Sequence, residues 1–217
     1  MTRPTPYIPA LRFDWLTRFY DPILRATLKE EPLKRRLVEQ VGLRSGQRVL
    51  DLGCGTATLT IMLARACPEA EIVGLDGDPR ALAIGRDKVA RAGLRVELHE
   101  GIAQEAPFPP ASFDRVVSSL VFHHLDTDAK RAALARARDL LRPGGELHVL
   151  DWGRAGSTLM RLAFLSVQLL DGFRTTGDNV RGRLPALIAE AGFEGVAETH
   201  RARTMFGVMS LYRATRP

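Results

Sequence analysis

Cysteine and lysine are scarce in this chain of 217 residues, and no long apolar run interrupts it. Its two cysteines, Cys54 and Cys67, cannot form a disulfide framework, and neither has metal-ligating neighbours. No apolar run approaches the roughly 20 residues that span a bilayer. An apolar signal segment is not expected either, because Pro4, Pro6 and Pro9 interrupt the N-terminus. These absences favour a cytoplasmic protein without a metal site.

The basic side chains are nearly all arginines, and they are spread along the chain. Only four of the 31 basic residues are lysines, and the formal net charge is +6. Hydrophobic residues make up 45% and charged residues 26%, as in ordinary globular proteins. The scattered arginines indicate solvated faces rather than a groove that follows a phosphate backbone. We therefore expect no nucleic-acid partner, whereas peripheral contact with an anionic membrane and an acidic substrate both stay open.

Short apolar runs alternate with helical stretches through the middle of the chain. Such alternation predicts right-handed βαβ units and a largely parallel sheet. Residues 1–46 are interpreted as a helical lead-in, because their leucines recur at near-helical spacing. Strands are expected at 48–51, 71–76, 94–98, 114–118 and 146–151, with helices at 58–66, 79–92 and 127–141.

The alternation stops after residue 151. An apolar helical segment is expected at 159–170, a polar and flexible stretch at 175–179, and a further helix at 184–191. The last two apolar runs are close enough in sequence to pair as an antiparallel hairpin at the sheet edge. These runs are 193–199 and 205–212, and we interpret residues 1–217 as one domain whose core is 47–151.

The most informative stretch is the glycine-rich turn in VLDLGCGTA, after the first expected strand. Its glycines let a ligand approach the backbone, and the helix that follows offers unpaired N–H groups. A dinucleotide-binding motif would have Gly or Ala three residues after Gly55, where Thr58 stands. Asp51, just before the turn, would repel a pyrophosphate and attract an ammonium group. The turn therefore favours a cationic or zwitterionic nucleoside over NAD.

A second acidic residue, Asp76, ends the second expected strand. It follows Gly55 by 21 residues, the spacing at which an acid in a βαβ unit reaches ribose hydroxyls. A carboxylate facing two hydroxyls accepts two charge-assisted hydrogen bonds. The alternative is that Asp76 and Asp78 both cap the helix that begins at Pro79. We assign Asp76 to the ribose and Asp78 to the cap.

Four motifs occur in the order typical of one enzyme family. The four motifs are Asp-x-Gly-x-Gly at 51–55, Asp76, Pro-Phe-Pro at 107–109 before Ser-Phe-Asp at 112–114, and Leu-Arg-Pro-Gly-Gly at 141–145. The set resembles the class I S-adenosylmethionine-dependent methyltransferases over roughly residues 47–151. The stretch 101–125, with its His-His-Leu sequence, resembles the ubiquinone/menaquinone-type branch, which methylates small molecules.

The resemblance implies an α/β fold and a cofactor site. The fold would be Rossmann-like and doubly wound, with a helical lead-in and a seven-stranded sheet of order 3-2-1-4-5-7-6 whose strand 7 is antiparallel. The cofactor would be S-adenosylmethionine: the glycine turn lines its methionine part, Asp76 holds the ribose, and the end of strand four passes the sulfonium. The acceptor would be a small, lipophilic or lipid-like molecule. The cofactor-binding residues implied are Asp51, Gly53, Cys54, Gly55, Asp76, Gly77, Ile102, Ala103, Ser118 and Ser119.

Two positions depart from the family's pattern. Ala57 stands where a third glycine is common, which is a small change at a helix start. Ile102 stands where an acid usually accepts a hydrogen bond from the adenine amino group. Apolar contact and the backbone N–H of Ala103 are then left to hold the base.

Three positions are candidates for catalysis. His123 could act as a base, although in this branch the motif is mostly structural. Asp151, at the end of strand five, could orient the acceptor or cap the next segment. Tyr20, followed by Asp21, resembles a pair that closes over the cofactor in relatives, or packs as an ordinary helix residue. His123 and His124 are not expected to bind a metal, because adjacent side chains point apart.

The segments on either side of the core are interpreted as the acceptor side. Residues 1–46 and the apolar helix at 159–170 would form a lid over the acceptor, and 152–217 would add the terminal hairpin. Phe164, Leu165 and Leu169 would then indicate a lipophilic acceptor, unless that helix face is ordinary core. Phospholipid-headgroup and quinone-precursor methylation both stay open.

Two other functions are kept as alternatives. An RNA or protein methyltransferase would be expected to carry Asn/Asp-Pro-Pro-Tyr/Phe after strand four, where Ser-Ser-Leu-Val stands at 118–121. A cofactor-binding protein without catalysis is the other, and Ile102 favours it.

Overall fold

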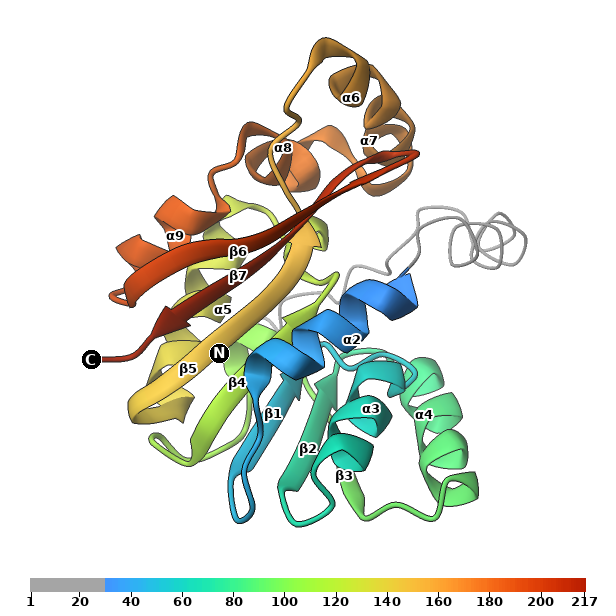
Figure 1. Cartoon of the computed structure of the whole chain (residues 1–217), viewed down its shortest axis with the longest axis vertical. Helices are drawn as coiled ribbons and strands as arrows, with labels where there is room; N and C mark the ends of the chain where they lie inside the picture. Colours follow the sequence, from blue (N-terminus) through green and yellow to red (C-terminus); the bar gives the residue numbers. More distant parts are fainter. Residues whose placement is uncertain (1–29) are drawn as a thin grey trace, which may run out of the picture.

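The computed structural model describes residues 30–217, apart from the side chains at positions 159, 166, 170 and 171. Its centre is a seven-stranded sheet of order β3-β2-β1-β4-β5-β7-β6, as expected (Figure 1). Neighbouring strands from β3 to β5 are parallel, whereas β7 runs antiparallel to both β5 and β6. The strands are β1 Arg48–Leu52, β2 Glu71–Asp76, β3 Val96–Glu100, β4 Phe113–Ser119, β5 Leu141–Trp152, β6 Glu194–Thr204 and β7 Gly207–Thr215.

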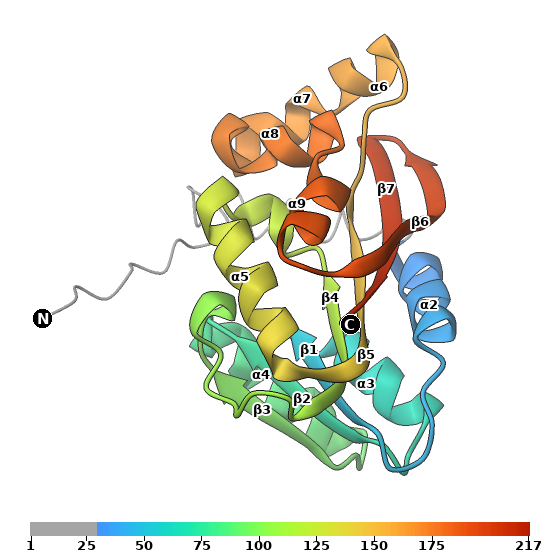
Figure 2. The same cartoon turned by 90° about the vertical axis from the view of Figure 1, so that its left-hand side faces the viewer.

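Helices cover both faces of the sheet (Figure 2). Along β1 the side chains alternate between the two faces, so Val49 packs with α2 and α3, whereas Leu50 packs with α5 and α9. The helices are α2 Glu30–Val41, α3 Thr58–Ala66, α4 Pro79–Arg91, α5 Thr127–Leu140, α6 Thr158–Ala163, α7 Leu165–Asp171, α8 Phe173–Arg181 and α9 Leu184–Glu190, with short 3-10 turns η1 Ala103–Glu105 and η2 Phe122–His124. Among the described residues, no helix is long and apolar enough to cross a membrane.

Helix starts follow the capping residues of the sequence. The Asp78 carboxylate accepts a hydrogen bond from the Arg80 N–H at 2.8 Å, and Pro79 occupies the first turn of α4. In the same way, Asp126 accepts from the Ala129 N–H at 3.0 Å at the start of α5. The assignment of Asp78 to a cap is therefore confirmed.

Two expectations about the second half of the chain were wrong. The apolar segment expected as one helix is two, α6 and α7, which meet at Phe164. The polar stretch 175–179, expected to be flexible, lies inside α8 with Thr176, Asp178 and Asn179 buried. These side chains tolerate burial because other segments supply hydrogen bonds; Thr127, for example, donates to Asp178 at 2.7 Å.

A strained alanine offers a test of the backbone. Ala111 is exposed and adopts a left-handed φ of 50°, which its Cβ disfavours. We predict that Ala111→Gly raises the free energy of unfolding by about 0.5–1 kcal/mol, because glycine adopts this φ without strain. Urea denaturation measures the change.

The matched control is the same substitution inside a helix. Ala132 is exposed on α5, where Ala132→Gly should lower the free energy of unfolding by about 1 kcal/mol. If both substitutions destabilise the protein alike, residue 111 does not have the left-handed conformation.

Candidate active site

The glycine turn lies at the carboxyl end of β1, the edge at which open α/β sheets bind ligands. Gly53 has a φ of +78°, and an ideal Cβ there would come within 2.2 Å of the Val121 side chain. Gly55 also has a positive φ, of +52°, but an ideal Cβ there would meet nothing within 4 Å. The backbone at Gly53 therefore packs directly against the segment that follows β4. The backbone at Gly55 instead faces open space that a ligand can enter.

Asp51 is a buried carboxylate with only one of its oxygens satisfied. Its side chain is on β1, and the residue is 1% exposed. Oδ2 accepts from the Thr60 hydroxyl at 2.7 Å, whereas the buried Oδ1 has no hydrogen-bond partner among the described residues. Burial raises the pKa of Asp51 to about 6, opposed by the Thr60 hydrogen bond and by the charge of Lys34 on α2. An oxygen of this kind fits a ligand that brings a cationic donor.

The two serines at the end of β4 have different roles. Ser118 is fully buried and donates from Oγ to the Leu52 carbonyl at 2.9 Å, so its hydroxyl joins β4 to β1. The Ser119 hydroxyl is buried without a partner among the described residues. Asp51 pairs with Val117, two residues before Ser119, so the Asp51 and Ser119 side chains point to the same face of the sheet. Two unsatisfied oxygens therefore lie on one face at this edge.

Asp76 connects the glycine turn to the end of β2. Its Oδ2 accepts from the Gly55 N–H at 2.7 Å, and its Oδ1 accepts from the Asp78 N–H at 2.8 Å. Burial raises the pKa of Asp76, against the opposing effect of these hydrogen bonds and one from Gly77. A carboxylate can accept about four hydrogen bonds, so Asp76 keeps capacity for ligand hydroxyls.

The other residues expected at the cofactor site contribute in different ways. Cys54 is buried, and its burial raises the pKa of the thiol well above its usual range, so it does not act as a nucleophile. Ile102 precedes η1, whose first residue is Ala103, and its side chain offers no hydrogen-bond acceptor. Tyr20 lies outside the described residues.

The structure brings together two of the candidate catalytic residues. His123 Nδ1 lies 2.9 Å from Asp151 Oδ1, and both side chains are buried. The Asp151 carboxylate also accepts from the Phe122 N–H at 2.8 Å, the Trp152 N–H at 2.7 Å and the Asn179 Nδ2 at 3.1 Å. Because Asp151 acts as the acceptor, the His123 proton on this side is on Nδ1, and Nε2 faces away from the carboxylate.

The two adjacent histidines do not point apart, and that expectation was wrong. The ring centroids of His123 and His124 are 3.9 Å apart. Both residues are in the 3-10 turn η2, where successive side chains are only about a third of a turn apart. Burial lowers the pKa of His124 well below its usual value. Among the described side chains, no group of three His, Cys, Asp or Glu residues could hold a metal.

Sequence reasoning missed a buried ion pair behind this cluster. Lys130 on α5 is fully buried; its Nζ donates to the carbonyls of Leu125 at 2.7 Å and Thr175 at 2.5 Å, and lies 3.7 Å from Asp178 Oδ2. Burial lowers the pKa of Lys130. The available signal was its position on α5, three residues before the buried Ala133, on the helix face that packs inward.

Comparison with known proteins agrees with this geometry. Residues 49–145 match the methyltransferase domain family. The chain is 32% identical over 205 aligned residues to the ubiquinone/menaquinone biosynthesis C-methyltransferase UbiE of Pseudomonas paraeruginosa, covering 85% of this chain and 78% of that protein. It is 39% identical over 119 residues to the demethylmenaquinone methyltransferase of Thermus thermophilus, covering 55% of this chain and 53% of that protein.

Solved structures show the same fold. The apo form of the S-adenosylmethionine-dependent methyltransferase SibL matches with a TM-score of 0.64 and 28% identity over 79% of this chain, which spans half the length of SibL. An O-methyltransferase family protein from Burkholderia thailandensis matches in fold with a TM-score of 0.71 and 21% identity, over 91% of this chain and 58% of that one. The chain therefore belongs to the class I S-adenosylmethionine-dependent methyltransferases of the ubiquinone/menaquinone type, and its cofactor is S-adenosylmethionine.

Proposed function

We propose that this enzyme transfers the methyl group of S-adenosylmethionine to a ring carbon of a lipophilic, quinone-type small molecule. The observation that carries this proposal is the similarity to UbiE, named as a C-methyltransferase of ubiquinone and menaquinone biosynthesis, over most of both chains. The bound cofactor supplies an electrophilic methyl sulfonium. The protein's own tasks are then to orient the two reactants, exclude water and set the acceptor's protonation state.

We assign the cofactor contacts to the residues at the edge of β1, β2 and β4. Asp51 is the partner for the ammonium group, because its Oδ1 is buried without a donor. The open backbone at Gly55 borders the methionine part, and Asp76 keeps acceptor capacity for the ribose hydroxyls. Ser119 offers the second unsatisfied oxygen. Ile102 and Ala103 contact the adenine.

The raised pKa of Asp51 predicts how cofactor affinity depends on pH. With a pKa of about 6, the carboxylate is ionised above pH 6 and attracts an ammonium group, whereas below pH 6 it becomes protonated. The ligand's amino group keeps its proton over this range, since α-amino groups have pKa values near 8. We predict that the Kd for S-adenosylmethionine is nearly constant between about pH 6.5 and 7.5 and rises about tenfold per pH unit below 6. Calorimetric titration measures this.

Two variants and a control accompany this titration. Asp51→Asn should weaken binding at least tenfold at pH 7.5 and remove the loss below pH 6, and Asp76→Ala should also abolish tight binding. Asp78→Asn removes a nearby charge but keeps an effective helix cap, so its affinity should match the wild type. A Kd unchanged in Asp51→Asn would exclude the ammonium contact.

We also propose that His123 removes the acceptor's hydroxyl proton, with Asp151 as its positioning partner. A ring carbon of a quinol becomes more nucleophilic when an adjacent hydroxyl loses its proton. The hydrogen bond between Asp151 and Nδ1 sets the ring orientation and directs proton exchange to Nε2. The alternative is that the pair only fastens η2 to β5.

The two roles of His123 have different kinetic consequences. We predict that His123→Gln lowers kcat for a demethylmenaquinol-type acceptor by 10²–10⁴-fold while cofactor affinity stays the same. Transfer of label from S-adenosylmethionine in detergent micelles measures this across pH. The control is His99→Gln, which changes a half-buried histidine on β3.

A purely structural role would instead lower the melting temperature of His123→Gln and leave the shape of its pH–rate profile unchanged. If the wild-type enzyme methylates no quinol, the quinone-type acceptor itself is wrong.

We further propose that one end of the molecule contacts membranes. Among the side chains that the structure describes, four of the five exposed large apolar ones belong to α6, α7, α8 and the turn between β6 and β7. Figure 1 shows these elements gathered at its upper end. Large exposed apolar surface of this kind is typical of an interaction site, and the net charge of +6 suits an anionic bilayer. The four side chains are Leu162, Leu169, Phe173 and Met205.

Vesicle sedimentation tests this contact. The wild-type protein should sediment with phosphatidylglycerol vesicles and less with phosphatidylcholine vesicles, because charge adds to apolar burial. The double variant Leu162→Ser/Leu169→Ser should lose at least half of this binding. Ile84→Ser, which removes the fifth exposed apolar side chain, on α4, should bind like the wild type. Equal loss in both variants would contradict a membrane surface at the α6–α8 end.

A further inference from the structure

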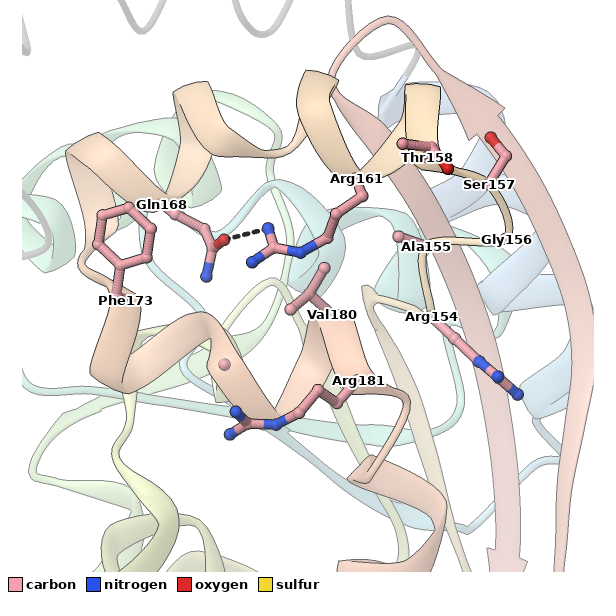
Figure 3. A pocket seen from close by; sticks show the side chains of 11 residues that line it. Arg154, Ala155, Gly156, Ser157, Thr158, Arg161, Gln168, Phe173, Val180 and Arg181 are labelled. Carbon is pink, nitrogen blue, oxygen red and sulfur yellow. Dashed lines mark hydrogen bonds between the residues drawn. The ribbon is translucent and has the colours of Figure 1, made fainter.

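A pocket of about 690 Å³ lies among α6, α7, α8 and the segment that follows β5 (Figure 3). It is separate from the glycine turn and borders the Asp151 cluster. The Ala155 N–H donates to the Val180 carbonyl at 3.3 Å, and both residues line the pocket. Asn179, next to Val180, contacts Asp151. The pocket residue Val180 therefore directly follows a residue that contacts Asp151, and the lining contains no residue assigned to the cofactor.

The charged residues among the described lining of the pocket are all basic. Among the described residues that line the pocket, three are arginines and none is acidic. Figure 3 shows Arg161 reaching into the pocket from α6, and Arg181 on the opposite wall formed by α8. The Arg154 side chain points away from the pocket in the same view. Arg161 and Arg181 thus line the pocket from two different helices.

Arg161 is held in place by a buried neutral side chain. Gln168, on α7, is 2% exposed; its Nε2 donates to the Thr176 hydroxyl at 3.1 Å, and its Oε1 accepts from Arg161 Nη1. An amide orients a guanidinium without neutralising its charge. Since a guanidinium carries five N–H donors, Arg161 keeps donors for a ligand.

The Arg181 guanidinium lies against a glycine. The described acid beside it, Asp178, also faces two other cations. An ideal Cβ on Gly177 would lie 3.0 Å from Arg181 Nη2, so the guanidinium rests against that glycine. Asp178 Oδ1 is 3.6 Å from Arg181 and 3.1 Å from Arg183, while its Oδ2 is 3.7 Å from Lys130. One carboxylate that faces three cations leaves an excess of positive charge beside the pocket.

The remaining walls are partly apolar. Phe173 and Val180 line the pocket on α8, and Ala155 lines it after β5. A ligand that satisfies this surface has an apolar or aromatic body and a negatively charged end. Two guanidinium groups match a carboxylate or a phosphate, both of which accept paired hydrogen bonds from arginine.

We propose that this pocket binds the methyl acceptor through an anionic group, a carboxylate or phosphate, held between Arg161 and Arg181. The enzyme then prefers quinone-type acceptors that carry such a group over neutral ones of the same size. Arg161 and Arg181 are specificity-determining residues. The assignment of the ligand as the acceptor rests on the proposed function, whereas the anion site itself does not.

Binding to the cofactor-free protein tests the anion site. The matched probes are 4-hexylbenzoate and 4-hexylbenzamide, which differ in charge and not in shape, and calorimetry measures the Kd of each. 4-Hexylbenzoate (the benzoate probe) should bind at least tenfold more tightly than 4-hexylbenzamide (the amide probe). Arg161→Gln and Arg181→Gln should each remove at least tenfold of benzoate affinity and change amide binding less than twofold.

Two further variants separate a built site from general positive charge. Arg154→Gln removes the same charge from a side chain that points away from the pocket, so benzoate binding should stay within twofold of the wild type. Gly177→Ala keeps every charge, suits a helix and requires only a small shift of the Arg181 guanidinium, so benzoate binding should stay within about twofold of the wild type. Equal losses in Arg154→Gln and Arg161→Gln, or equal binding of benzoate and amide, would overturn the proposal.

Additional probes identify the source of the anion. Hexyl phosphate that binds more tightly than 4-hexylbenzoate would assign a phosphate group, and the reverse order a carboxylate. Inorganic phosphate that binds as tightly as hexyl phosphate would show a site for small free anions, which overturns the acceptor assignment.

Activity distinguishes this inference from the proposed function. With a hydroxylated aromatic carboxylate as acceptor, Arg161→Gln should raise KM at least tenfold with kcat nearly unchanged, and the methyl ester of that acceptor should show no such effect. If the anionic probes bind as expected but no acceptor is methylated, the proposed function fails and the anion site stands. If neutral quinols are methylated and the anionic probes do not bind, this inference fails alone.

Discussion

The arrangement of the active-site edge depends on one buried carboxylate, that of Asp151. A fully buried carboxylate is stable only when hydrogen bonds replace its hydration. Asp151 receives four such bonds, from Phe122, His123, Trp152 and Asn179. These donors come from η2, β5 and α8, so the need to satisfy a single side chain draws three separate segments together. The same hydrogen bonds position His123, the candidate base, and Asn179, which directly precedes the pocket residue Val180.

Asp51 is equally buried but far less satisfied, and the contrast between the two carboxylates separates structure from ligand binding. With Thr60 as the only described donor to its side chain, Asp51 has a raised pKa, so its ionised form is less favourable in the protein without ligand than it is in water. Backbone strain gathers at the same edge, where Ala57 and Leu120 adopt left-handed φ values of 59° and 61°. Unsatisfied charge and strained backbone commonly mark sites whose geometry serves a ligand rather than stability.

Local signals predicted the core of the fold well. The turn after β1, the Asp78 cap and the alternation of strands and helices all depend on residues near one another in the chain. The strand order came from the family resemblance, and the observed sheet agrees with it. Errors arose where polar residues were assumed to be exposed. Asp178 and Asn179 were expected in a flexible loop, but Thr127, Lys130 and Asp151, 28 or more residues earlier in the chain, make their burial in a helix favourable. Thr176, expected in the same loop, is buried with hydrogen bonds to Gln168 and Gly172.

The sequence by itself predicted a cofactor site at the glycine turn, because turn chemistry and the spacing from Gly55 to Asp76 are short-range properties of one βαβ unit. Only the tertiary structure decided which carboxylate is satisfied and which is not. It also placed His123 against Asp151 and set Arg161 and Arg181 on facing helices around one pocket. The physical reason is that burial, hydrogen-bond partners and local charge are supplied by segments distant in the chain, and no local pattern records which segments will meet.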